Sequence, residues 1–346
     1  MPTPFPLQLG LDTFGDTSTA PDGSLSSHAQ TIREVVEQGV LADQVGLDFI
    51  GIGEHHRPDF AVSAPDTVAT AIAARTEKIH VGTAVTVLSS EDPLRVFQRF
   101  STLDAISGGR AEVILGRGSF IESFPLFGYD LDDYEILFEE KLDLFMRARA
   151  QEPITWSGQT RASLDNAEVY PHVESGLLKA WIAVGGSPQS VIRTAQHGLP
   201  LMLAIIGGEP LAFAQFTDLY RRALDQLGNP LQPIGVHMPG HVAETDEQAI
   251  DEAWPFIAPY FSRIFAERGG RPITEGQFRQ MVGPDGAYAI GSPETVARKI
   301  VRTLEGLGAS RFDLKYANGT MPHSMLTRSI ELYGTQVAPL VRDMLA

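Results

Sequence analysis

Short apolar runs and longer amphipathic stretches alternate along almost the whole chain. Apolar runs bounded by glycine or polar residues predict strands, and apolar residues that recur every three or four positions predict helices. One helical face, for example, carries Ile32, Val35, Val36 and Val40. On these criteria we expect eight strands, at 7–14, 48–53, 78–88, 111–116, 180–185, 199–206, 233–243 and 311–316.

A helical pattern follows each expected strand. The predicted helices cover 28–46, 64–76, 93–106, 131–149, 187–197, 209–227, 245–266, 293–307 and 323–342. Repeated strand–helix units indicate a parallel sheet, and eight of them fit a closed (β/α)8 TIM barrel. A doubly wound open sheet is the competing architecture.

No break in composition divides the chain, so we expect one domain over residues 1–346. Two stretches look like insertions into the barrel. The first, 150–179, contains two short β-like segments at 154–158 and 167–173 that could form a hairpin. The second, 266–290, is rich in glycine and charge, which makes it a candidate lid.

Composition then excludes several classes of function. The 346 residues are 43% hydrophobic and 20% charged, as is usual for a soluble globular protein. A formal charge of −16 argues against nucleic acid and anionic membranes as partners. The absence of cysteine removes thiolate metal sites, iron–sulfur clusters and cysteine nucleophiles. With no basic leader and no apolar span, the expected location is the cytoplasm.

The second expected strand ends abruptly in Glu54, His55 and His56. In a (β/α)8 barrel this end of a strand borders the active site. Because side chains alternate along a strand, the two histidines would face opposite ways and do not naturally chelate one metal. His237 and His241 could add ligands, but their spacing matches no standard site. A metal site, ordinary hydrogen-bonded histidines and a base beside a bound cofactor all remain open.

Two segments share a Gly-Ser-Pro helix start. In the first, Gly185-Gly186-Ser187 precedes a helix whose free amides suit a phosphate, with the hydroxyls of Ser187 and Ser190 in support. In the second, Glu294 lies in the first turn, where its charge would occupy the positive end of the helix. The alternative is that both segments only start helices. If one copy binds phosphate, we expect it to be the first.

Two further features are weaker alone. Arg117 stands between glycines at the end of the fourth expected strand, where a guanidinium suits a phosphate or carboxylate. A structural salt bridge is the alternative for this arginine. In the third expected strand, Gly82 and Ala84 interrupt a β-branched run, which suggests that something flat packs against the backbone there.

Together these motifs resemble the bacterial luciferase-like flavin monooxygenases. The segments GEHH, VGTAVTVL, ISGGR, GRGSF, FG (127–128), GSPQSV and QHGLPLMLA occur in that family's order and spacing, over about residues 5–205. The resemblance implies a (β/α)8 barrel that binds flavin mononucleotide (FMN), used in its reduced form, or in one branch a deazaflavin coenzyme. It also implies O2 and a small organic substrate as reactants, and a separate flavin reductase as a partner.

The resemblance assigns roles to individual positions. Arg117 and the segment Gly185-Gly186-Ser187, together with Ser190, would hold the flavin phosphate. The Ala84–Val85 peptide would support the flavin ring, often through a cis linkage. His55 would act as acid or base.

Two positions depart from the luciferases. Gly116 stands in place of a reactive cysteine, and Gly186 stands in place of an acid. The light-emitting enzyme is also a heterodimer, whereas a single chain here suggests a homodimer. Neither luminescence nor a long-chain aldehyde substrate is therefore implied.

The favoured interpretation is an FMN-dependent monooxygenase that oxygenates a small organic substrate. Two alternatives are kept beside it, a non-catalytic flavin-binding protein of the same fold and a metal-dependent barrel hydrolase built on the histidines.

Overall fold

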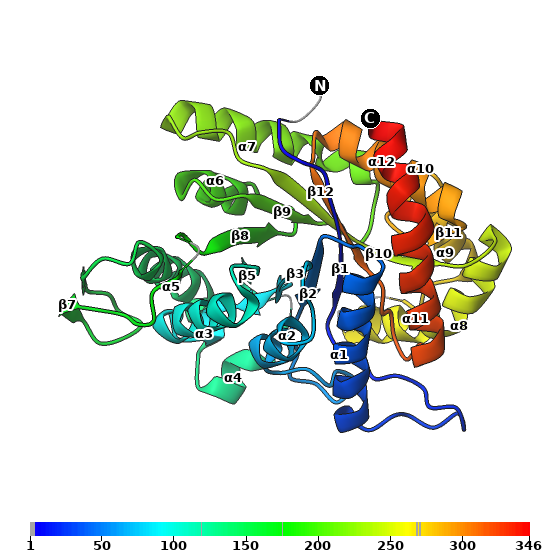
Figure 1. The fold of residues 1–346 in the computed structure, drawn as a ribbon, viewed down its shortest axis with the longest axis horizontal. Coiled ribbons are helices and arrows are strands. Elements are labelled where there is room, and N and C mark those ends of the chain that lie inside the picture. Colours follow the sequence, from blue (N-terminus) through cyan, green and yellow to red (C-terminus); the bar gives the residue numbers. More distant parts are fainter. Residues whose placement is uncertain (1–3, 119, 175, 268, 270) are drawn as a thin grey trace.

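The structure is a computed structural model that describes residues 4–118, 120–174, 176–267, 269 and 271–346. Eight parallel strands form a barrel in their order along the chain (Figure 1). They are β1 (Gln8–Thr13), β2 (Phe49–Ile52), β3 (His80–Thr83), β5 (Ala111–Gly116), β8 (Lys179–Val184), β9 (Leu201–Ala204), β10 (Ile234–Val242) and β12 (Arg311–Lys315). Strand β10 pairs with both β12 and β9, which closes the ring. The predicted (β/α)8 barrel is confirmed, and the open sheet is wrong.

Helices surround the barrel as predicted. They are α1 (His28–Gln44), α2 (Pro65–Ala73), α3 (Pro93–Ser107), α5 (Tyr134–Arg149), α6 (Pro188–Gln196), α7 (Ala214–Leu227), α8 (Asp246–Glu267), α10 (Pro293–Leu307), α11 (His323–Leu332) and α12 (Ala338–Leu345). Short turns lie at η1 (Leu88–Ser90), α4 (Ser123–Phe127), η2 (Leu131–Asp133) and η3 (Pro210–Phe213). Apolar residues such as Leu9, Val35 and Ile72 form one continuous core between strands and helices. None of the helices in the described ranges is long and apolar enough to cross a membrane.

Two predicted elements are interrupted. The third expected strand splits into β3 and the short β4 (Thr86–Val87), with a cis Ala84–Val85 peptide bond between them, as the resemblance implies. The last expected helix is divided by a π-helical turn, η4 (Tyr333–Val337). At this turn Gly334 lies against α1, where an added Cβ would come within 2.2 Å of Val45. A local widening of a helix in this way is a single-turn π-bulge.

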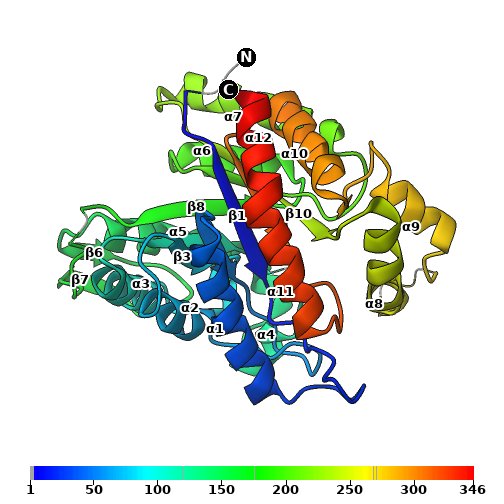
Figure 2. The same ribbon diagram turned by 45° about the vertical axis from the view of Figure 1, so that its right-hand side comes forward.

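The two insertions lie on opposite sides of the barrel (Figures 1 and 2). The first contains the expected antiparallel hairpin, made of β6 (Ile154–Trp156) and β7 (Leu164–Ala167). The sequence places the second strand of this hairpin at 167–173, which is wrong, because that strand ends at Ala167. The second insertion contains α9 (Glu275–Val282) and leads into β11 (Ala289–Gly291), which pairs with β10. Residues 268 and 270 of the candidate lid lie outside the described residues.

Near the N-terminal ends of the strands, the barrel interior is filled by a buried ionic group. Arg311 has no exposed surface, and its guanidinium lies 2.7 Å from Glu112 and 2.9 Å from Asp313. The same guanidinium lies 3.7 Å from the ring centroid of Phe49 and 4.9 Å from that of Trp181. A ligand must therefore enter the barrel from the C-terminal ends of the strands, as in other barrels of this type.

Candidate functional site at the barrel mouth

One wall of the barrel mouth is lined by small side chains. Val85 and Ala183 pack on a buried cluster inside the barrel that contains Phe49 and Trp181, and both keep exposed surface although the residues next to them in the chain are buried. Ala204, next along this wall on β9, is also half-buried. Gly185 is exposed, and a Cβ added there would meet no atom within 4 Å. The wall formed by Val85, Ala183, Gly185 and Ala204 is therefore partly exposed and carries small side chains.

The Ala84–Val85 peptide is packed between glycines of the neighbouring strands. A Cβ on Gly51 would lie 2.7 Å from the Ala84 Cβ, and a Cβ on Gly53 would lie 2.7 Å from the Ala84 carbonyl oxygen. On the other side, a Cβ on Gly116 would lie 2.5 Å from a methyl group of Val85. Glycine at these three positions lets the peptide approach both strands. This explains why glycine stands at position 116 on structural grounds.

The three residues of the Glu54-His55-His56 segment face different surroundings. Glu54 accepts a hydrogen bond at 2.7 Å from the backbone N–H of Val87, just after the cis bond. Burial raises the pKa of the Glu54 carboxyl to about 8. His56 packs edge-on against Phe127, and burial lowers its pKa. Only His55 faces the barrel mouth.

His55 is enclosed by aromatic rings. Its ring centroid lies 5.0 Å from Phe14, 4.4 Å from Phe60 and 4.7 Å from Phe120. Its Nδ1 is 3.6 Å from the carboxylate of Glu122, while its Nε2 is buried and has no hydrogen-bond partner among the described residues. Buried polar atoms normally have partners, so this Nε2 is suited to a ligand in the mouth.

The first Gly-Ser-Pro segment starts α6 as predicted. Ser187 is the N-cap, and its hydroxyl accepts a hydrogen bond from the Ser190 amide at 3.5 Å. Gly186 has φ of +113°, a conformation that favours glycine. The Ser190 hydroxyl is buried without a partner among the described residues.

The second Gly-Ser-Pro segment holds a carboxylate of the chain itself. Asp246, the first residue of α8, accepts hydrogen bonds from the Ser292 amide at 2.7 Å and the Thr295 hydroxyl at 3.0 Å. Ser292 and Thr295 are the counterparts of Ser187 and Ser190 in the repeated motif. The second helix start is thus occupied. Glu294 lies in the first turn of α10 as predicted, but it is not the group that binds these two donors. An aspartate from a distant helix does so, because its carboxylate reaches both the amide and the hydroxyl.

Arg117 is connected to α6 through a carboxylate. Its guanidinium pairs with Glu135 of α5 and lies 5.1 Å from the ring centroid of Tyr134. Glu135 also pairs with Arg193 of α6 at 3.0 Å, and Arg193 pairs with Glu139 at 2.7 Å. The salt-bridge alternative for Arg117 is therefore present, and it connects the arginine to α6 through Glu135.

Arg193 and Glu135 are not among the site residues expected from the sequence. Arg193 Nη1 is buried without a hydrogen-bond partner in the described part of the chain, like the Ser190 hydroxyl three residues earlier. Residues three apart lie on the same helical face, and this spacing could have identified Arg193. No local pattern points to Glu135.

The opposite wall of the mouth carries buried charge. His237 Nδ1 lies 2.6 Å from Asp12 Oδ2, and Lys315 Nζ lies 3.2 Å from Asp16 Oδ2. Phe14 lies between the two histidines of the mouth, stacked on His237 at 6.1 Å and edge-on to His55. His237 thus belongs to the site, though not as a metal ligand.

The histidines do not converge on a metal. His241 Nε2 pairs with Glu252 of α8 at 2.8 Å, apart from the Asp12–His237 pair. Within the described ranges, no group of three or more His, Cys, Asp or Glu side chains could hold a metal ion.

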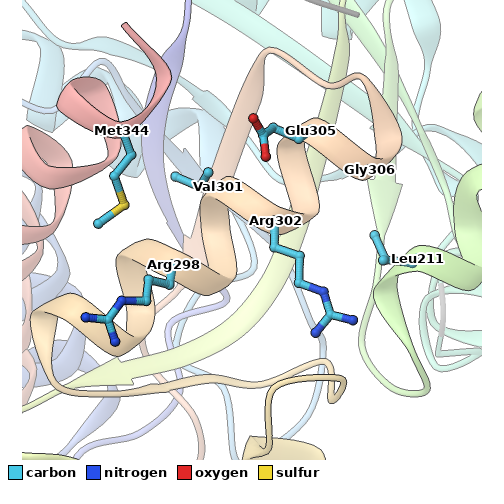
Figure 3. Close-up of a pocket in the computed structure, with 7 residues that line it drawn as sticks. All are labelled: Leu211, Arg298, Val301, Arg302, Glu305, Gly306 and Met344. Atoms are coloured by element: carbon cyan, nitrogen blue, oxygen red, sulfur yellow. The ribbon is translucent and has the colours of Figure 1, made fainter.

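A separate pocket of about 600 Å³ opens on the outside of the barrel (Figure 3). Its lining comes from η3, α10 and α12, namely Leu211, Arg298, Val301, Arg302, Glu305, Gly306 and Met344. None of these residues lies at the C-terminal end of a barrel strand, so this pocket is not part of the site.

Known proteins share both the sequence pattern and the fold. The family model described as luciferase-like monooxygenase matches residues 14–311. The alkanal monooxygenase alpha chain of Photorhabdus luminescens is 25% identical over 351 residues, covering 92% of this chain and 93% of that relative.

Three solved structures have the same barrel. Monooxygenase RslO1 from Streptomyces bottropensis gives a TM-score of 0.83 at 22% identity, covering 96% of this chain and 99% of that one. The oxygenating constituent of 3,6-diketocamphane monooxygenase from Pseudomonas putida, in complex with FMN, gives 0.78 at 18% identity, with coverages of 97% and 99%. The coenzyme F420-dependent tetrahydromethanopterin reductase from Methanopyrus kandleri gives 0.73 at 18% identity, with coverages of 97% and 99%.

The family model spans most of the chain, and the ordered motifs lie around one barrel mouth. The chain therefore belongs to the luciferase-like family of flavin-dependent monooxygenases and oxidoreductases.

Proposed function

We propose that the chain is an FMN-dependent monooxygenase whose flavin binds against the small-residue wall of the mouth. The observation that carries this proposal is the contrast between the two Gly-Ser-Pro helix starts. The α10 start holds the Asp246 carboxylate through an amide and a hydroxyl, whereas the matching Ser190 hydroxyl at α6 is buried without a partner among the described residues. An anion from a ligand fits the α6 start in the way that Asp246 fits the α10 start.

The residues near α6 suit a phosphate. Gly185, Gly186 and Ser187 supply backbone amides at the positive end of the helix, and the Ser190 hydroxyl adds a donor. Arg117 and Arg193 supply positive charge from two sides. Both arginines share Glu135, so a bound phosphate would compete with this carboxylate for them.

The small-residue wall suits the flavin ring. A ring whose phosphate is bound at α6 would lie along Ala183 and Gly185 and reach the Ala84–Val85 peptide. When bound, reduced flavin supplies the electrons that activate O2 for oxygen transfer. His55 would hold or move a proton at Nε2, and the rings of Phe14, Phe60 and Phe120 around it would exclude water.

A deazaflavin coenzyme is the second candidate, because the Methanopyrus kandleri neighbour depends on coenzyme F420. FMN is favoured, because the Pseudomonas putida neighbour carries FMN and aligns with a higher TM-score. We also propose that the substrate is a small organic molecule, that a separate reductase supplies reduced FMN, and that the enzyme is a cytoplasmic homodimer.

Fluorescence titrations of the chain with FMN, riboflavin and the deazaflavin coenzyme test the cofactor. The proposal expects FMN to bind at least about tenfold more tightly than riboflavin, since only FMN carries the phosphate. Equal affinities for FMN and riboflavin would reject the phosphate site at α6. Tighter binding of the deazaflavin than of FMN would make it the cofactor instead.

A further inference from the structure

The Asp12–His237 pair has no role in the flavin site proposed above. Asp12 is fully buried, and its Oδ2 lies 2.6 Å from His237 Nδ1. The two residues come from β1 and β10, which are separated in the barrel by β12. A contact across an intervening strand requires both side chains to point into the barrel.

The contact with Asp12 fixes which nitrogen of His237 carries the proton. A carboxylate accepts a hydrogen bond but cannot donate one when ionised, so Nδ1 carries the proton and donates it to Asp12. Nε2 then presents a lone pair in the neutral imidazole. No hydrogen-bond partner of Nε2 occurs among the described residues, and the side chain keeps 10% of its surface exposed. The arrangement matches a histidine oriented by a carboxylate for proton transfer.

The surroundings indicate what kind of molecule would meet this nitrogen. Phe14 stacks on His237 at 6.1 Å, and Phe60 lies 6.3 Å from both Phe14 and Tyr260. Such a cluster of rings favours a flat aromatic ligand. The ordinary pKa of an aromatic hydroxyl is about 10. It is therefore far closer to the pKa of imidazole than the pKa of an aliphatic alcohol is.

Charged groups from several elements face the pair. Besides Asp12, β1 and the loop after it carry Asp16, and β12 carries Asp313 and Lys315. His55 approaches from β2 on the far side of Phe14. Lys315 Nζ lies 4.8 Å from the Phe14 ring centroid, and its charge is paired with the Asp16 carboxylate.

We propose that His237, oriented by Asp12, is a second proton-accepting residue of the mouth, and that the substrate is a phenol. The phenolic O–H bond breaks as an N–H bond forms at Nε2, which leaves a phenolate beside an imidazolium that Asp12 stabilises. The proton later returns to solvent, so no oxidant or reductant is consumed in this step. A phenolate ring is richer in electrons than a phenol, which favours oxygen transfer to it. This inference rests on the proposed function, which supplies the oxygen.

Fluorine NMR of a fluorinated nitrophenol tests the inference, since its chemical shift reports ionisation and flavin does not obscure it. The probe is added to the chain, with and without FMN, about one pH unit below the point at which the free probe ionises. The expected result is saturable binding in the phenolate form. His237→Gln and Asp12→Asn should reduce the bound phenolate at least about tenfold.

His241→Gln is the matched control, because it removes the other buried histidine–carboxylate pair from the same strand. It should leave the phenolate signal intact. No phenolate with the unmodified chain, or a signal that survives in His237→Gln, would overturn the inference. Loss of the signal in His55→Asn but not in His237→Gln would assign the proton to the other wall and would overturn it as well.

A second measurement reads the change of protonation in the unmodified chain and needs a variant only to assign the resonance. In the chain labelled with nitrogen-15 histidine, addition of the probe should convert one unprotonated ring nitrogen to a protonated one, and His237→Gln assigns that resonance. An unchanged histidine spectrum under saturating probe would also overturn the inference. FMN affinity is recorded on the same samples, so that failure of the flavin proposal appears there, separately from failure at His237.

Discussion

Asp246 accepts a hydrogen bond from the Ser292 amide at 2.7 Å, and this contact places a carboxylate at the start of α10. In the same motif at the start of α6, no carboxylate of the described residues is bonded to the Ser190 hydroxyl. The chain thus contains two copies of one helix start, of which one is filled by its own side chain. The difference supplies matched variants for the first test.

We expect Ser190→Ala and Thr295→Ala to affect different properties, FMN binding in the first and the free energy of unfolding in the second. Ser190→Ala should weaken FMN binding by about 1–2 kcal/mol and leave the free energy of unfolding nearly unchanged, because its hydroxyl has no partner to lose in the described part of the chain. Thr295→Ala should lower the free energy of unfolding by about 1 kcal/mol, because it removes a bond to Asp246, and should leave FMN binding unchanged. Fluorescence titration and urea denaturation measure both. Reduced FMN affinity in Thr295→Ala alone would reverse the assignment of the two copies.

Arg117→Ala should weaken binding of FMN much more than binding of riboflavin, since only FMN carries the phosphate that the guanidinium would meet. The expected loss is about tenfold or more for FMN. Glu135→Gln should have the opposite sign and strengthen FMN binding, because Glu135 competes with the phosphate for Arg117 and Arg193. Equal losses for both ligands in Arg117→Ala would remove this arginine from the phosphate site.

His55→Asn should leave FMN affinity within about twofold. It should slow the reoxidation of bound reduced FMN by O2 by about tenfold or more. The imidazole is assigned to proton handling, and its neighbours are Phe14, Phe60, Phe120 and Glu122, away from α6. Stopped-flow mixing of the reduced complex with O2 measures the rate. His56→Asn is the control, because that neighbour packs against Phe127 outside the mouth. A change in His56→Asn as large as that in His55→Asn would indicate a structural effect of the segment.

Glu54 predicts a pH dependence of stability. Its pKa is raised from near 4.5 to about 8 by burial, so the folded chain holds the proton more tightly than the unfolded chain. The associated stability is complete below the unfolded pKa and is lost as the pH rises toward 8. Glu54→Gln resembles the protonated acid, so it should match the parent near about pH 5 and exceed its free energy of unfolding by about 2–4 kcal/mol near about pH 8.5. Parallel pH profiles for the two proteins in urea denaturation would count against the raised pKa.

Lys299 is expected to hold the second insertion against α10. Its ammonium donates to the carbonyl oxygens of Val282 and Gly283 at 2.7 Å and of Tyr288 at 2.6 Å, which fixes the end of α9 to α10. Lys299→Met would leave three carbonyls without this donor and should lower the free energy of unfolding by about 1–3 kcal/mol. The backbone amides of residues 275–290 should exchange faster in this variant, while the exchange rates of the barrel strands should stay unchanged. The exposed Lys78→Met serves as control, and unchanged exchange in 275–290 would show that Lys299 does not hold the insertion.

The sequence alone determined the alternation of strands and helices and the helix start at Ser187, because both depend on interactions between neighbouring residues. The period of apolar positions sets strand and helix, and a serine before proline sets a cap within three residues. The resemblance added the cis bond at Ala84–Val85, which the structure contains. The boundary of β7 was missed, because a short exposed hairpin has little apolar pattern to define it.

Only the tertiary structure decided which side chains meet. Asp12 and His237 are 225 positions apart, and barrel closure brings β1 and β10 close enough for their contact. Asp246 fills the α10 start, although Glu294 is far nearer in sequence, because the packing of α8 against β11 aims the aspartate at the amide of Ser292. Glu135 joins Arg117 to Arg193 because α5 passes beside both. Such pairings depend on the distances between folded elements, and a local pattern of residues does not contain those distances.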